Sequence, residues 1–124
     1  MKEEIVAKNA PAAIGPYSQG IAAGNLVFLS GQLPVNPGDG SMPDGVEAQV
    51  KRVFENISAI LTTHGLGWEN VVKTTVFLKN MDDFTVMNGI YGKYFTRPYP
   101  ARSTVGVAKL PKDALVEIEV TAVR

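Results

Sequence analysis

The 124-residue sequence contains no cysteine and a single histidine, His64. The absence of cysteine excludes a disulfide framework, a thiolate nucleophile and a zinc site with cysteine ligands. One histidine cannot build a histidine cluster for a metal ion. We therefore expect no metal ion and no catalytic thiol in this protein. His64 precedes a glycine at the end of a predicted helix, where a capping role is favoured over catalysis.

The sequence also lacks a net charge and long hydrophobic runs, because 12 basic residues balance 12 acidic ones. A nucleic-acid-binding protein normally carries a basic excess that neutralises phosphates. No run approaches the roughly 18 apolar residues of a membrane span. The first residues, MKEEIVAKNAP, include acidic residues where a signal peptide needs a basic segment, and they lack its apolar core. We expect a cytoplasmic protein that binds neither nucleic acid nor a membrane.

The length and composition indicate one globular domain, residues 1–124. Hydrophobic residues make up 45% of the chain and charged residues 19%, a balance that suits a single hydrophobic core. Hydrophobic periodicity then divides the chain into six strands and two helices. The predicted strands are 3–8, 21–23, 26–29, 71–78, 102–109 and 115–123, with a two-residue hairpin turn at Gly24 and Asn25. The predicted helices begin at Val46 and at Asp82, and each has an apolar stripe (Val46, Val50, Val53, Phe54, Ile57, Ile60, Leu61; Phe84, Met87, Ile90, Tyr91, Tyr94). This order predicts an α+β fold in two layers, a six-stranded mixed sheet with both helices on one face.

The last two predicted strands are separated by a proline-containing turn at 110–113, and we expect them to form a hairpin. In the second strand Glu117 and Glu119 share one face and apolar residues share the other. Arg102 lies in the first strand. With the turn centred after Pro111, Glu117 would face Gly106, and Arg102 would lie about 13 Å away at ~3.3 Å per residue. On alternation alone these charges form a solvated outer face.

Several segments together resemble the YjgF family of reactive-intermediate deaminases, the RidA proteins. They are AxxAIGPYSQG at residues 10–20, FLSGQLP at 28–34, NIxAIL at 56–61, ARSTVGVAKLP at 101–111 and VEIE at 116–119. The resemblance implies a fold like that of trimeric bacterial chorismate mutase, with homotrimers that carry their sites in the intersubunit clefts. It also implies hydrolysis of imines and enamines that pyridoxal-phosphate enzymes such as serine/threonine dehydratase release.

The resemblance assigns roles to individual residues. Arg102 corresponds to the arginine that binds the substrate carboxylate, and Glu117 to the glutamate that handles water. Thr104 stands where the family commonly has a cysteine that acts through its backbone. The remaining family positions are Tyr17 of GPYSQG, Ser30 and Gly31 at a strand end, and Asn88 in the second helix.

The chemistry of a 2-imino acid suits these residue types. The planar fork of arginine binds a carboxylate bidentately. The protonated imine carbon is already electrophilic, so hydrolysis needs orientation, a positioned water and a base. We therefore expect a homotrimeric 2-iminobutanoate/2-iminopropanoate deaminase without a cofactor. The alternative is a non-catalytic trimer that binds 2-oxo acids and acts in regulation, for which Glu117 is not needed. Ribonuclease activity, attached to some family members, is disfavoured by the neutral charge.

Overall fold

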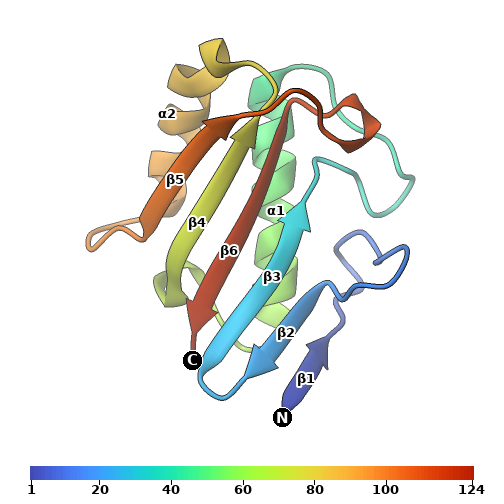
Figure 1. The fold of residues 1–124 in the computed structure, drawn as a ribbon, viewed down its shortest axis with the longest axis vertical. Helices are drawn as coiled ribbons and strands as arrows, with labels where there is room; N and C mark the ends of the chain where they lie inside the picture. Colours follow the sequence, from blue (N-terminus) through green and yellow to red (C-terminus); the bar gives the residue numbers. More distant parts are fainter.

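A six-stranded mixed sheet carries two α-helices on one of its faces (Figure 1). The computed structural model describes residues 1–124. The strands are β1 (Lys2–Ile5), β2 (Gly20–Ala23), β3 (Leu26–Gln32), β4 (Val71–Leu78), β5 (Ala101–Gly106) and β6 (Val116–Val123). The helices are α1 (Val46–Thr63) and α2 (Phe84–Tyr94), with short 3-10 turns η1 (Trp68–Asn70), η2 (Met81–Asp83) and η3 (Pro111–Asp113). The predicted α+β fold class is confirmed.

The strands lie in the order β1-β2-β3-β6-β4-β5. All neighbours are antiparallel except β4 and β5, which are parallel. Parallel neighbours need a crossover connection, and α2 supplies it between β4 and β5. The predicted hairpin of β2 and β3 around Gly24 and Asn25 is confirmed, with Gly24 in the left-handed region at φ 60°.

The predicted hairpin between the last two strands is wrong. Strand β4 lies between β5 and β6, so Glu117 pairs with Phe77 and Gly106 pairs with Leu78. A proline-containing turn favours pairing of adjacent strands, but a central position in the sheet satisfies the backbone groups on both edges of β6. It also places the apolar face of β6 over the helices. The 13 Å separation along a hairpin therefore has no counterpart in the fold.

The core lies between the sheet and the helices. The apolar stripe predicted for α1 is buried except for Val46, which is partly buried, and the apolar alternates of β6 are buried with it (Val50, Val53, Phe54, Ile57, Ile60, Leu61; Val116, Ile118, Val120, Ala122). Helix α1 ends at Thr63, and His64 is its C-cap, as predicted, with a backbone N–H that donates to the Leu61 carbonyl. No helix combines the length and the hydrophobicity that a membrane crossing requires.

Aromatic rings join α1 to α2 and fix the second helix on the sheet. Phe54 of α1 stacks on Tyr94 of α2, with ring centroids 4.3 Å apart, and meets Tyr91 edge-on at 6.0 Å. Trp68 and Phe95 complete the cluster. Such pairs stabilise beyond the area they bury. They therefore determine where the exposed side of α2 presents its polar residues.

The N-terminal strand is shorter than predicted, ending at Ile5 rather than Lys8. Beyond it the backbone leaves the ladder, because the Ala7 N–H donates to the side-chain Oε1 of Gln19 at 2.6 Å. Helix α2 begins two residues later than predicted, after the 3-10 turn η2. There the Asn80 side chain accepts from the backbone N–H of Asp82 and caps the turn.

A buried asparagine in α1 generates a prediction about stability. Asn56 is fully buried, and its Nδ2 donates to the carbonyls of Leu33 and Val35 at 3.0 and 2.9 Å. The Asn56→Ala substitution leaves both carbonyls without this partner. We expect the free energy of unfolding to fall by about 2–4 kcal/mol. Urea unfolding at a fixed protein concentration measures the loss, with the exposed Thr62→Ala in the same helix as the control. A loss no larger than that of the control would contradict the prediction.

Candidate functional site

A β-bulge in β3 brings the backbone of Gly31 against Glu117 of β6. Leu29 pairs with Val120 and Gln32 pairs with Ile118, so β3 uses one residue more than β6 over this interval. A Cβ atom built on Gly31 would lie 1.9 Å from Glu117 Oε2. Because Gly31 has no Cβ atom, the Glu117 carboxylate can lie directly against the Gly31 backbone.

Two effects raise the pKa of Glu117. Burial of the carboxyl group is the larger, and the like charge of Glu119 adds to it. Both side chains lie on the face of the sheet opposite to the helices, since Val116 and Ile118 are buried in the core. A carboxylate whose pKa is raised towards neutrality is a better general base. The role that the resemblance implied for Glu117 stays a prediction.

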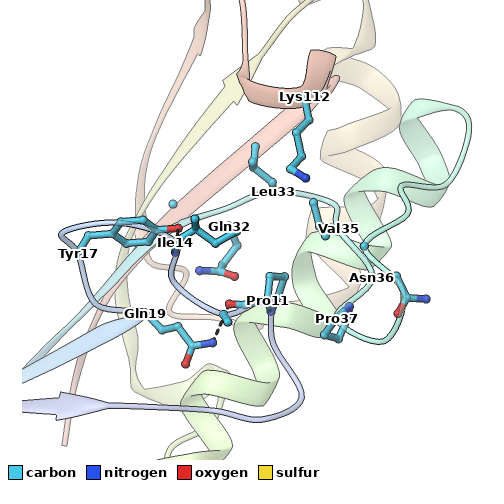
Figure 2. A pocket seen from close by; sticks show the side chains of 13 residues that line it. Pro11, Ile14, Tyr17, Gln19, Gln32, Leu33, Val35, Asn36, Pro37 and Lys112 are labelled. Atoms are coloured by element: carbon cyan, nitrogen blue, oxygen red, sulfur yellow. Dashed lines mark hydrogen bonds between the residues drawn. The ribbon is translucent and has the colours of Figure 1, made fainter.

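Tyr17 and Gly31 line a cavity of about 250 Å³ at the end of β3 (Figure 2). The Tyr17 hydroxyl accepts from the backbone N–H of Ile14 at 3.3 Å, and 53% of the residue is exposed. Ser30 does not line the cavity, but its hydroxyl donates to the Ser18 carbonyl at 2.5 Å. Ser30 therefore ties the loop that carries Tyr17 to the bulge of β3.

A buried glutamine that the sequence analysis did not single out holds this loop. Gln19 is 4% exposed, and its Nε2 donates to the carbonyls of Ala7, Ala10 and Pro11. Its Oε1 accepts from the Ala7 N–H. The amide is thus fully used within the chain. The only sign of its importance in the sequence is its place in the GPYSQG motif.

Arg102 lies on the helix-facing side of β5, at the edge of the sheet. Its Nη1 donates to Asn88 Oδ1 at 2.7 Å, and its guanidinium carbon lies 4.6 Å from the centre of the Tyr91 ring and 5.6 Å from that of Phe84. Tyr91 is itself held by a 2.8 Å hydrogen bond between its hydroxyl and that of Thr74. Stacking and one hydrogen bond orient the fork and leave its other N–H groups available for a carboxylate.

Thr104 follows Arg102 on the same face of β5. Its hydroxyl oxygen is buried and has no hydrogen-bond partner within the chain. The resemblance implied a backbone role at this position. Tyr91 and Phe84 were not predicted as a platform for Arg102, although both belong to the inner stripe predicted for α2, which their packing confirms.

The site residues form two separate groups in one chain. Arg102, Asn88 and Thr104 lie on the helix side of β5, whereas Glu117 lies on the open face of β6 beside Gly31. The ladder shows this directly, because Arg102 pairs with Thr74 and Glu117 pairs with Phe77, three residues along β4 and so on the opposite face. One chain therefore does not bring the arginine and the glutamate together.

Comparison with known proteins agrees with this topology, which is that of a Rid-type domain. The family model described as "Endoribonuclease L-PSP" matches residues 7–124, and the chain belongs to that family. A crystal structure from Yersinia pestis, described as a protein of unknown function of the conserved Rid family, covers 100% of both chains with a TM-score of 0.97 and 46% identity.

Two curated relatives carry different names. The "2-iminobutanoate/2-iminopropanoate deaminase" of Escherichia coli strain K12 is 49% identical over 127 residues, which cover 100% of this chain and 99% of the relative. The "Putative regulator AldR" of Lactococcus lactis is 51% identical over 119 residues, 95% of this chain and 94% of the relative. Relatives of similar identity are thus named as an enzyme and as a regulator.

The raised pKa of Glu117 predicts how stability depends on pH. At a pH below the ordinary glutamate value, the carboxyl group is protonated in the folded and the unfolded chain. As the pH rises, the unfolded chain releases its proton first, so ionisation of Glu117 destabilises the fold until the pH exceeds the raised value. We expect Glu117→Gln to gain stability relative to the parent across this window and to keep the gain above it.

Urea unfolding at a series of pH values measures this difference. Glu3→Gln, at an exposed position of β1, is the matched control and should show no such gain. A gain of Glu117→Gln that shrinks as the pH rises would mean that the folded protein favours the ionised carboxylate.

Proposed function

We propose that this protein hydrolyses 2-iminobutanoate and 2-iminopropanoate to the corresponding 2-oxo acids and ammonia. The observation that carries the proposal is the partly buried Glu117 carboxylate, seated on the Gly31 backbone beside an open cavity and with a raised pKa. The name of the Escherichia coli relative, 49% identical over the whole chain, supports the same activity.

Each group in the two clusters has a task in this hydrolysis. Arg102 binds the substrate carboxylate through its fork, with Asn88 holding the guanidinium and Thr104 contributing through its backbone. Glu117 takes a proton from a water whose oxygen bonds to the imine carbon, which gives a tetrahedral carbinolamine. Glu117 then passes this proton to the nitrogen, the C–N bond breaks and ammonia leaves, and the ionised Glu117 takes the hydroxyl proton as the carbonyl forms. Tyr17, at the cavity wall, orients the water.

The proposal includes a site shared between chains of a homotrimer. Arg102 and Glu117 lie on opposite faces of one sheet, so a neighbouring chain must supply one of them. The open face of the sheet also exposes apolar side chains: Leu26, Phe28 and Val105 are 43%, 44% and 42% exposed. Exposed apolar side chains on a sheet face suit an interaction surface. A second chain seated there would cover them.

The regulatory alternative keeps the same carboxylate-binding arginine and omits the hydrolysis. The relative named as a putative regulator, 51% identical, favours keeping it as the second candidate. Ribonuclease activity, suggested by the family description, has less support because 12 basic and 12 acidic residues leave no basic excess.

Two substitutions separate the enzyme from the regulator. Glu117→Gln keeps the shape and removes the base, so imine hydrolysis should fall by about 100-fold to 10,000-fold while 2-oxobutanoate still binds. Arg102→Lys keeps the charge but loses the fork and the stacking on Tyr91, so binding and hydrolysis should weaken together. A coupled assay with a dehydratase that generates the imine, and calorimetric titration of 2-oxobutanoate, measure both on the same preparations. Hydrolysis by Glu117→Gln at the parent rate would exclude this base. A parent that hydrolyses the imine no faster than buffer would favour the regulator.

The shared site predicts complementation between inactive variants. Glu117→Gln and Arg102→Ala trimers should each be inactive, but co-refolding them in equal amounts places an intact Glu117 beside an intact Arg102 in some clefts. With random assembly about a quarter of the sites, one half multiplied by one half, regain both groups across the interface. The hydrolysis rate of the mixture, compared with that of a co-refolded parent, measures the fraction. No recovery from a mixture that light scattering shows to be trimeric would place both residues of each site in one chain.

A further inference from the structure

The cavity beside Gly31 contains one charged side chain, that of Lys112. Of the thirteen residues that line the cavity, the other twelve are apolar or neutral. Figure 2 shows Lys112 reaching from η3 towards the cavity, on a different side of it from Tyr17. The catalytic roles proposed above do not use this ammonium group.

The backbone at Lys112 is held in a conformation that residues other than glycine rarely adopt. Lys112 has φ 57° and ψ 21°, and Asp113 also has φ 57°. Two successive non-glycine residues in the left-handed region are unfavourable unless their surroundings hold them. Asp113 is held by its ion pair with Lys79 and by the hydrogen bond from its N–H to the Leu110 carbonyl. The turn so fixed directs the Lys112 side chain to the cavity.

The Lys112 ammonium has no ionic partner within the chain. The three ion pairs join Lys51 to Glu47, Arg52 to Glu55 and Lys79 to Asp113, and none involves Lys112. The carboxylate of Glu117 lies against Gly31 of the cavity lining, and its pKa is raised by burial and by Glu119, with no contribution from a cation. Lys112 is therefore free to pair with a charge that a ligand brings.

We propose that Lys112 is a specificity-determining residue that binds a second, distal carboxylate of the substrate, so that the site accepts 2-imino acids derived from acidic amino acids. The inference rests on the proposed function, in which Arg102 takes the carboxylate next to the imine carbon and Glu117 faces the attacking water. Lys112, the one charged residue that lines the cavity, then meets the far end of the substrate. A cation in that position favours a carboxylate over a methyl group.

A pair of ligands of equal length tests this role. 2-Oxoglutarate and 2-oxopentanoate have the same carbon chain and differ in the terminal carboxylate, which a methyl group replaces. The parent should bind 2-oxoglutarate more tightly. Lys112→Met should weaken 2-oxoglutarate about 10-fold or more and leave 2-oxopentanoate within about 2-fold. Lys112→Arg should retain the preference. Lys109→Met, in the same connection but outside this cavity, is the matched control and should behave like the parent.

The outcomes separate this inference from the proposed function. Equal losses for both ligands in Lys112→Met would mean that Lys112 binds the carboxylate common to them, and no loss for either would mean that it does not reach the ligand; each overturns the inference. A parent that binds neither ligand overturns it as well. If the parent binds both with the expected preference but hydrolyses no imine, the proposed enzyme fails while the role of Lys112 stands. Thermal unfolding and light scattering confirm that the variants remain folded and assembled.

Discussion

The close contact between the Gly31 backbone and the Glu117 carboxylate is the constraint on which the cavity side of the site depends. Side chains alternate between the faces of a strand, so one extra residue reverses every position beyond it. The bulge in β3 moves Gln32 to the buried side, where it is 5% exposed, and leaves Gly31 beside Glu117. A side chain at Gly31 would displace the carboxylate, and the desolvation that raises its pKa would change with it.

Buried amides hold the irregular segments around this contact. Gln19 fixes the loop that leads to Tyr17, and Asn56 fixes the backbone that follows β3. Gln49 at the start of α1 donates to the Pro43 carbonyl and accepts from the Leu115 N–H, so it joins the loop before α1 to the start of β6. These segments have no sheet partners, and side-chain amides satisfy their backbone groups instead. Specific hydrogen bonds thus fix the segments around the cavity, as packing fixes the core.

The sequence predicted local features better than distant pairings. The stripe of α1, the β2–β3 turn and the two faces of β6 follow from periodicity alone. The hairpin of β5 with β6 failed because a turn signal reports proximity in the chain, while pairing with β4 depends on how the whole sheet closes. A strand, a helix and a strand in succession, β4 to α2 to β5, did carry the signal of a parallel crossover. The burial of Asn56 was also detectable in the sequence, because this residue lies on the apolar stripe of α1, three residues after Val53.

The separation of Arg102 from Glu117 within one chain has an electrostatic consequence. An arginine beside Glu117 would stabilise the ionised carboxylate and lower its pKa, which would weaken it as a base. In the sheet, β4 instead separates the strands of the two residues, and their side chains lie on opposite faces. The guanidinium is held by Asn88 and the Tyr91 ring. In a shared site the cation would then meet a substrate carboxylate before it meets Glu117. The substrate's own negative charge would offset the arginine, so Glu117 would remain able to accept a proton when the imine is bound.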